Sequence, residues 1–298
     1  MNILWILEKQ FDVSLDRATW LETIKVLQKK HTIRLVTGYL NNKPQFSGIR
    51  DEIVYISVSK IPVVKRFFLY LKQVKILEKY VIKYRPNALI LNSLNPMIVH
   101  KAAKLAKKYS FRTYLDIRTL PVQSGLIRGV IDNYLFRKSL TIAANNFSGI
   151  SYITNEMQRY CIEKYKLVKH NSSIWTSAVD SEKFKPTPPN DRKEPCLKLL
   201  YHGTIVENRG LDKVIEAFSL LPDLNINFDI VGNGNGIKFL KGVIEKHNEL
   251  SRIKILPPVP YEQVPDVIND ADLGILPFQP WNGWNTSSPI KLFEYLSC

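Results

Sequence analysis

Cysteine, histidine and methionine are scarce in this sequence, and long apolar runs are missing. The three cysteines, Cys161, Cys196 and Cys298, lie far apart, and with only five histidines they make no metal-ligand spacing. We therefore expect free thiols in a reducing cytoplasm, not a disulfide or zinc scaffold. No apolar run approaches the roughly 20 residues of a membrane span, and the N-terminus carries Glu8 too early for a signal peptide. The sequence therefore predicts no membrane-spanning segment.

Positive charge is in excess, and it is concentrated in one half of the chain. The formal net charge is +15. Residues 1–180 contain 29 Lys and Arg against 12 Asp and Glu, whereas residues 181–298 contain 13 against 15. A basic half favours an anionic membrane surface, an acidic or lipid-phosphate acceptor, or nucleic acid as partner, although it can also serve solubility alone. No nucleic-acid motif accompanies the charge, so nucleic acid is not expected.

Strand-like and helix-like segments alternate along the chain, which is typical of α/β proteins with parallel sheets. The 298 residues, 45% of them hydrophobic, allow two domains with a core each. Residues 187–195 are rich in proline and charge and indicate a linker. We therefore expect a first domain over residues 1–186 and a second over residues 196–298. Expected strands cover residues 2–7, 32–38, 53–58, 88–93, 112–118, 148–154, 197–202, 228–231, 253–256 and 271–277, and expected helices cover residues 16–29, 63–84, 97–109, 127–144 and 155–165, with another beginning at Leu211.

The expected helix over residues 63–84 is the most basic one. At about 100° per residue its lysines fall on one side, opposite a broad apolar face. Such a helix suits an anionic membrane, although a solvated lysine face without a partner explains the pattern equally well. The lysines of this face are Lys65, Lys72, Lys75, Lys79 and Lys83.

The last twelve residues, SSPIKLFEYLSC, predict a helix with Ser288 as N-cap and Pro289 at its first position. Free N–H groups at a helix start suit a phosphate or diphosphate. We expect one side of the helix, Ile290, Phe293 and Leu296, to pack on the domain. Lys291 and Glu294 share another side. They present an acid and a base together, unless they form only an ordinary ion pair on a solvated face.

Four segments carry a family resemblance. They are YHGTIVENRGLDKVIEAF (201–218), FDIVGNG (228–234), PPVPYEQVPDVINDADLGILPF (257–278) and SSPIKLFEYLSC (287–298). Together they resemble the donor-binding half of GT-B glycosyltransferases of family 4, the glycosyl transferases group 1. The resemblance implies two Rossmann-like domains facing a central cleft, and sugar transfer with retention and without a metal or cofactor. It also implies further elements after Cys298, so we expect the second domain to be incomplete.

The resemblance also implies roles for individual residues. Glu294 is expected to hold the nucleotide ribose, and Asn285 and Thr286 are expected near the sugar. Asp116 and Arg118 end a strand of the first domain, where open α/β sheets place ligands. They are our candidate catalytic residues, unless they only pair with each other. The other expected donor-binding residues are Arg209, Lys291, Ser287 and Ser288 at the diphosphate, Gly203, Thr204, Gly232, Asn233 and Gly234 where the backbone approaches the nucleotide, and Pro260 beside the base.

Four places depart from the family pattern, and one of them is Ala178, which stands where the family has a glycine. Lys9, Gln10 and Phe11 stand where the family has a glycine pair after the first strand. In the family two cations clamp the diphosphate, and Thr204 stands at the position of the first, whereas Arg209 is the second. Either the leaving group is stabilised less strongly, or Lys291 replaces the missing cation. Thr286 replaces the first of two acids eight positions apart, of which Glu294 is the second.

From these residues we expect transfer of a sugar from a UDP- or GDP-sugar to a hydroxyl acceptor. The expected acceptor is a lipid-linked or surface-polysaccharide intermediate, handled in the cytoplasm at the inner face of an anionic membrane. Two alternatives stay open. One is an isomerase of the nucleotide-sugar 2-epimerase kind, and the other is an inactive, membrane-binding remnant of a glycosyltransferase.

Overall fold

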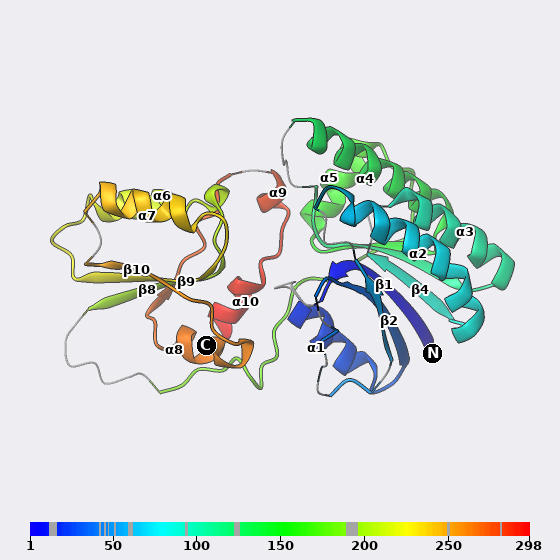
Figure 1. Ribbon diagram of the computed structural model, residues 1–298, viewed down its shortest axis with the longest axis horizontal. Coiled ribbons are helices and arrows are strands. Elements are labelled where there is room, and N and C mark those ends of the chain that lie inside the picture. The colour runs from blue at the N-terminus through cyan, green and yellow to red at the C-terminus, as the bar shows by residue number, and fades with distance from the viewer. Residues whose placement is uncertain are drawn as a thin grey trace. The chain divides into compact units, whose positions relative to one another are not determined.

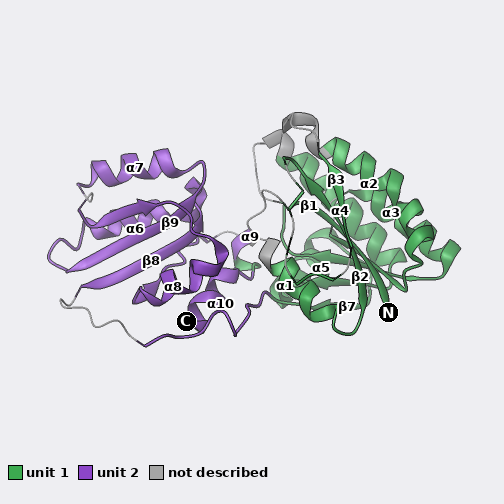
Figure 2. Ribbon diagram, turned by 60° about the horizontal axis from the view of Figure 1, so that its bottom comes forward, with its two compact units in different colours: residues 1–176, 285–287 green, residues 177–284, 288–298 purple. Residues whose placement is uncertain are grey.

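The structure is a computed structural model that describes residues 1–11, 17–41, 43–44, 46, 48–50, 52–58, 62–92, 95–121, 126–188, 196–248, 251–280 and 282–298. The chain forms two compact units (Figure 2). Unit 1 consists of Met1–Thr176 with Asn285–Ser287, and unit 2 consists of Ser177–Trp284 with Ser288–Cys298. Most of the expected linker, residues 189–195, lies outside the described residues.

Unit 1 contains a seven-stranded parallel sheet with the strand order β3-β2-β1-β4-β5-β6-β7. Because the strands run in the same direction, their carboxyl ends meet at one edge. The strands are β1 (Asn2–Gln10), β2 (Thr32–Tyr39), β3 (Ile53–Ser57), β4 (Ala88–Asn92), β5 (Arg112–Ile117), β6 (Gly149–Tyr152) and β7 (Ser172–Ile174), and the helices are α1 (Arg17–Leu27), α2 (Pro62–Tyr84), α3 (Pro96–Tyr109), α4 (Leu126–Asn146) and α5 (Asn155–Tyr165).

Helices cover both faces of this sheet, and each face has its own core. On one face α2, α3 and α4 lie next to one another (Figure 1). They bury Leu77, Val99 and Phe136 against the sheet. On the other face α1 packs Trp20 against Trp5 of β1. Burying side chains of this size stabilises the fold by about 1.5 to 3 kcal/mol each. This packing fixes the strands, and with them the residues at their carboxyl ends.

Helix α3 shows how local sequence fixes an element in unit 1. Asn95 is its N-cap and accepts a hydrogen bond from the Met97 N–H at 3.0 Å, while Pro96 stands at the first position. Ser110 ends the helix in the left-handed conformation, with φ 54°. A capped start of this kind is worth about 1 kcal/mol, and it places the helix N-terminus at the carboxyl edge of the sheet.

Unit 2 contains a four-stranded parallel sheet with the order β10-β9-β8-β11. Its core packs α6 and α7 on the sheet through Ile215, Phe218 and Leu240. A second cluster around Phe184 and Ile268 lies by α8. The elements are β8 (Leu197–Thr204), η1 (Glu207–Arg209), α6 (Leu211–Phe218), β9 (Ile226–Asn233), α7 (Ile237–Lys246), β10 (Ile253–Leu256), η2 (Tyr261–Gln263), α8 (Val264–Asn269), β11 (Leu273–Gly274), α9 (Asn282–Asn285) and α10 (Ile290–Ser297).

Several expected elements differ in extent, for example β1 and β11. Strand β1 runs on to Gln10, and Phe11 is fully buried, so the first strand is longer than expected. The strand expected over residues 271–277 shrinks to Leu273–Gly274, which pairs only with β8 at the side of the sheet. Among the helices that the structure describes, none is both long and apolar enough to span a bilayer.

Candidate functional site

The polar side of α10 is its buried side. Glu294 is 3% exposed and Lys291 9%, whereas Leu296 is 76% exposed. The expectation that Ile290, Phe293 and Leu296 form the packed face is therefore wrong, because the helix turns Lys291 and Glu294 toward the sheet. The burial also excludes an ion pair on a solvated face. A carboxylate and an ammonium group removed from water this far need polar partners.

The first turn of α10 differs slightly from the expected capping. The helix begins at Ile290, and Pro289 occupies the N-cap position without a side-chain capping bond. The Ser288 hydroxyl instead accepts a hydrogen bond from the Ser177 N–H at 3.2 Å, and the Ser177 hydroxyl donates to the Ser288 carbonyl at 2.6 Å. Ser288 thus fixes the chain that enters the helix.

Lys291 lies over the end of strand β8. A Cβ added to Gly203 would lie 2.6 Å from Lys291 Cε and 2.7 Å from Nζ, and Gly203 has φ +120°. The carbonyl of Gly203 in turn approaches Gly232 of β9, where a Cβ would lie 1.9 Å from that oxygen. Glycine is required at both positions, because any side chain would displace a neighbouring atom. The ends of β8 and β9 therefore pack closely against each other and, at Gly203, against the Lys291 ammonium group.

Burial changes the chemistry of Lys291. Desolvation, together with repulsion from Arg209, lowers the pKa of Lys291 to about 8, and Glu294 opposes the shift. Its Nζ also lies 5.3 Å from the centre of the Tyr201 ring. An anion bound here would restore the favourable interaction that the ammonium group lost on leaving water.

Arg209 closes the 3-10 helix after β8 and is held by aromatic rings. Its Cζ lies 5.0 Å from the Trp284 ring centre and 5.3 Å from that of Phe278, and the two rings stack with centroids 5.0 Å apart. Such cation–π contacts each contribute about 0.5 to 2 kcal/mol. They keep the guanidinium in a defined place, while the Tyr201 hydroxyl donates to the Thr204 carbonyl at 2.7 Å.

His202 is a residue of this site that the sequence reasoning missed. Its Nε2 lies 3.1 Å from Glu294 Oε2, and its side chain is 12% exposed. A histidine directly before Gly203 at a strand end was the available signal. Nothing in the strand pattern, however, shows which helix covers that strand end.

The remaining predicted donor residues divide between the units. Asn233 ends β9 and Gly234 follows it, with the Gly234 N–H donating to Asn233 Oδ1 at 2.8 Å. Pro260 follows β10 and is exposed. Thus Gly203, Thr204, Arg209, Gly232, Asn233, Gly234, Pro260, Ser288, Lys291 and Glu294 all belong to unit 2, whereas Asn285, Thr286 and Ser287 belong to unit 1. Within unit 1 the Thr154 hydroxyl donates to the Thr286 carbonyl at 2.8 Å.

Asp116 lies at the carboxyl edge of the unit 1 sheet and is 1% exposed. Its Oδ1 accepts a hydrogen bond from the Ser151 hydroxyl at 2.7 Å, while its buried Oδ2 has no hydrogen-bond partner within the part of the chain that the structure describes. Desolvation raises the pKa of Asp116 to about 6, against the opposing influence of Arg118 and Ser151. A carboxyl group in this state can accept or give up a proton near neutral pH.

Arg118 packs against a cluster of aromatic side chains. It donates from Nη1 to the Trp175 carbonyl at 2.6 Å, and its Cζ lies 4.6 Å from the Trp175 ring centre and 5.6 Å from that of Trp20. Its charge still acts on the neighbouring Asp116 carboxyl. The structure thus gives Arg118 a structural task in addition to any catalytic one.

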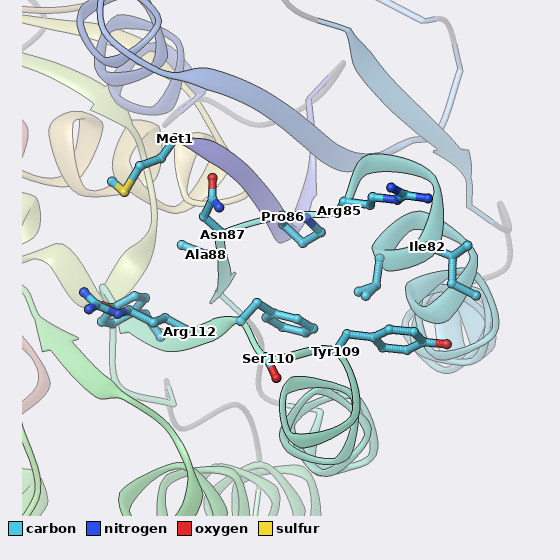
Figure 3. Close-up of a pocket in the computed structure, with 12 residues that line it drawn as sticks. Met1, Ile82, Arg85, Pro86, Asn87, Ala88, Tyr109, Ser110 and Arg112 are labelled. Atoms are coloured by element: carbon cyan, nitrogen blue, oxygen red, sulfur yellow. The ribbon is translucent and has the colours of Figure 1, made fainter.

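A groove of about 880 Å³ lies at the opposite, amino-terminal edge of the unit 1 sheet. It is lined by the ends of α2 and α3 and the starts of β4 and β5, and Figure 3 shows Arg85 and Arg112 on its two sides. Ligands of open α/β sheets bind at the carboxyl edge. The groove therefore does not belong to the site formed by Asp116.

Solved glycosyltransferases have the same fold. Sucrose-phosphate synthase from Thermosynechococcus elongatus superposes with a TM-score of 0.73 at 13% identity, over 94% of this chain and 77% of that one. The lipopolysaccharide outer core galactosyltransferase WaaB gives 0.67 at 16% identity, over 100% and 78%. The Anabaena protein Alr3699/HepE, crystallised with UDP and glucose, gives 0.64 at 12%, over 92% and 73%. The chain therefore has the GT-B fold expected from the sequence.

Sequence comparison finds a family match in the second half of the chain. Residues 181–298 match the family model "Glycosyl transferases group 1". The phosphatidylinositol N-acetylglucosaminyltransferase GPI3 subunit of Saccharomyces cerevisiae is 28% identical over 143 residues, which cover 46% of this chain and 32% of that protein. The putative colanic acid biosynthesis glycosyl transferase WcaI of Escherichia coli is 26% identical over 187 residues, covering 56% and 45%. The chain thus spans less than half of these relatives, and the group 1 resemblance is confirmed over residues 181–298.

Proposed function

We propose that this chain transfers a sugar from a nucleotide sugar to a hydroxyl acceptor, with retention of configuration at the sugar. One observation carries the proposal: the carboxylate of Glu294 is buried, and its Oε2 has no hydrogen bond among the described residues. A buried carboxylate oxygen without a donor is costly, so a bound ligand that brings hydroxyl groups stabilises it. The two vicinal hydroxyls of a ribose fit this requirement.

Lys291 and Arg209 supply the charge for a diphosphate in the proposed site. The Lys291 ammonium lies over Gly203 at the end of strand β8. Arg209 can bind a phosphate through two parallel hydrogen bonds. The repulsion between the two cations, which lowers the pKa of Lys291, is relieved when an anion binds. Together they offset the loss of the cation that Thr204 replaces.

The chemistry of retaining transfer depends chiefly on stabilising the departing diphosphate. Cations and backbone N–H groups of unit 2 serve that purpose in our proposal. On the acceptor side we assign Asp116, because its Oδ2 has no hydrogen-bond partner among the described residues and its pKa of about 6 suits a group that handles a hydroxyl proton. Arg118 is assigned the role of holding negative charge on Asp116. The family match and the UDP and glucose bound to the HepE protein support the donor class.

An anionic membrane is the proposed surface on which the acceptor is met. Helix α2 exposes Lys72, Lys75, Lys79 and Lys83 together with Phe67 and Phe68, which are 56% and 45% exposed. Each lysine near an anionic leaflet contributes about 1 kcal/mol, and an exposed aromatic pair can enter the headgroup region. The side chain of Lys65 lies outside the described residues. The proposal fails if vesicles that contain anionic lipid do not sediment the protein at low salt.

Calorimetric titration with UDP and GDP, with ADP as control, is the test of the donor site. We expect one of the first two to bind, and binding of neither refutes the proposal. The matching nucleotide sugar is then incubated without acceptor. Conversion of its sugar under those conditions indicates an isomerase, whereas conversion only in the presence of a hydroxyl acceptor supports transfer.

A further inference from the structure

His202 touches the residue on which the proposed function depends. It is the sixth residue of β8 and directly precedes Gly203. Its Nε2 lies 3.1 Å from Glu294 Oε2, and the two side chains are 12% and 5% exposed. Neither atom has another hydrogen-bond partner among the described residues. Each of these two buried atoms therefore depends on the other for its stabilisation.

We propose that His202 is a positioning residue, which donates to Oε2 of the Glu294 carboxylate and leaves the remaining acceptor sites of that carboxylate to the ribose hydroxyls of the nucleotide. This inference rests on the proposed function of the same site. The 3.1 Å contact is not aligned as a hydrogen bond without ligand. Contacts of this kind commonly tighten when the ligand is bound.

Tyr295 fixes the distance between the strand and the helix. Its hydroxyl accepts a hydrogen bond from the His202 N–H at 3.2 Å, and its ring meets the imidazole edge to face at 5.3 Å. The ring lies where a Cβ of Gly274 would be, 2.4 Å from the nearest ring carbon. Helix α10 is thereby seated on β8 and β11, and Glu294 is brought to His202 by packing on its neighbouring residue.

His202 also separates the two charges of α10. Lys291 and Glu294 are three residues apart on the helix, a spacing that favours an ion pair between them. Glu294 has contact with His202 at 3.1 Å, while the Lys291 ammonium lies over Gly203. Such an arrangement leaves Lys291 available for phosphate. Without His202 we expect Lys291 to turn toward Glu294, which removes both groups from the ligand.

The test uses the 298-residue chain and whichever of UDP and GDP binds. His202→Phe keeps the ring shape but removes the N–H, and we expect the Kd to rise about tenfold, as is common when a supporting residue is lost. His202→Gln places an amide N–H near the position of Nε2, and we expect it to bind within about threefold of the parent. His100→Phe, an exposed histidine in unit 1, is the control and should not change the Kd.

A double-mutant cycle separates positioning from general stability. In the Glu294→Gln background, His202→Phe should change the Kd less than twofold, an order-of-magnitude expectation for a residue that acts only through Glu294. An equal loss in both backgrounds, or parent-like binding by His202→Phe, overturns the inference. If the parent binds neither nucleotide, the proposed function fails, and thermal unfolding of the same four proteins decides the pairing. Non-additive Tm shifts then support the contact, and additive shifts refute it.

Discussion

The side chain of Lys291 occupies the space that any side chain at Gly203 would need. A Cβ at position 203 would lie 2.6 Å from Lys291 Cε. Gly203 also has φ +120°, which side chains rarely adopt. The strand end and the helix are therefore matched to each other, and four predictions follow from this and the other contacts of the two sites.

Gly203→Ala should weaken nucleotide binding about tenfold, because the new methyl group displaces the ammonium group from its place. Backbone strain should also lower the free energy of unfolding by about 1 to 3 kcal/mol. Titration calorimetry and thermal unfolding measure the two effects. Gly242→Ala is the matched control, since a Cβ there meets nothing within 4 Å. That control should raise stability slightly, as alanine does within a helix.

Nucleotide affinity should fall as the pH rises above about 8. The pKa of Lys291 is lowered to about 8, so at pH 9 most of the side chain is neutral before the ligand arrives. Binding a diphosphate then requires uptake of a proton, and the Kd should rise about tenfold between pH 7 and pH 9. Lys291→Arg stays charged over this range. A variant Kd that rises as steeply as that of the parent contradicts the assignment.

Glu294→Ala should weaken nucleotide binding by about 1.5 to 3 kcal/mol, the usual range for a charged hydrogen-bonding group. Removal of the carboxylate also leaves His202 without the contact at 3.1 Å. Glu245→Ala, which changes an exposed glutamate on α7, controls for net charge. An unchanged nucleotide affinity in Glu294→Ala contradicts the proposal that Glu294 binds the ribose.

Asp116→Asn should stabilise the protein increasingly as the pH rises. The folded-state pKa of Asp116 is about 6, above the unfolded value of 3.8. Its contribution to stability is therefore present below about pH 4 and is lost as the pH rises through 6. The advantage of the variant should grow by about 2 kcal/mol between pH 4 and pH 7.5. Unfolding curves at both pH values measure this difference, and Asp223→Asn, an exposed position, should show no such trend.

Periodicity and cap residues were sufficient to predict most elements of the fold. Helix α5 and strand β10 have the predicted bounds, because Thr154 caps the helix and a run of β-branched and aliphatic residues forms the strand. The family resemblance predicted the fold. These signals are local, or they belong to segments that resemble a known family.

The packing of α10 could not be predicted in the same way. Its apolar residues suggested one buried face, but Leu296 is exposed and Glu294 is buried. The deciding contacts come from β8, which lies about ninety residues earlier in the chain. The bond from Thr154 to Thr286 spans 132 residues and assigns Asn285–Ser287 to unit 1. Long-range partners of this kind leave no trace in periodicity or spacing.

The aromatic cluster that holds Arg118 has an optical consequence. Trp5, Trp20 and Trp175 meet in pairs with ring centroids 5.6 to 6.4 Å apart and at interplanar angles of 49° to 88°. Indole rings at such separations and angles couple their electronic transitions, which gives strong near-ultraviolet circular dichroism. All three belong to unit 1. The part of the dichroism that arises from these three rings therefore reports the tertiary structure of unit 1, and it provides a measure of folding for each variant of Asp116.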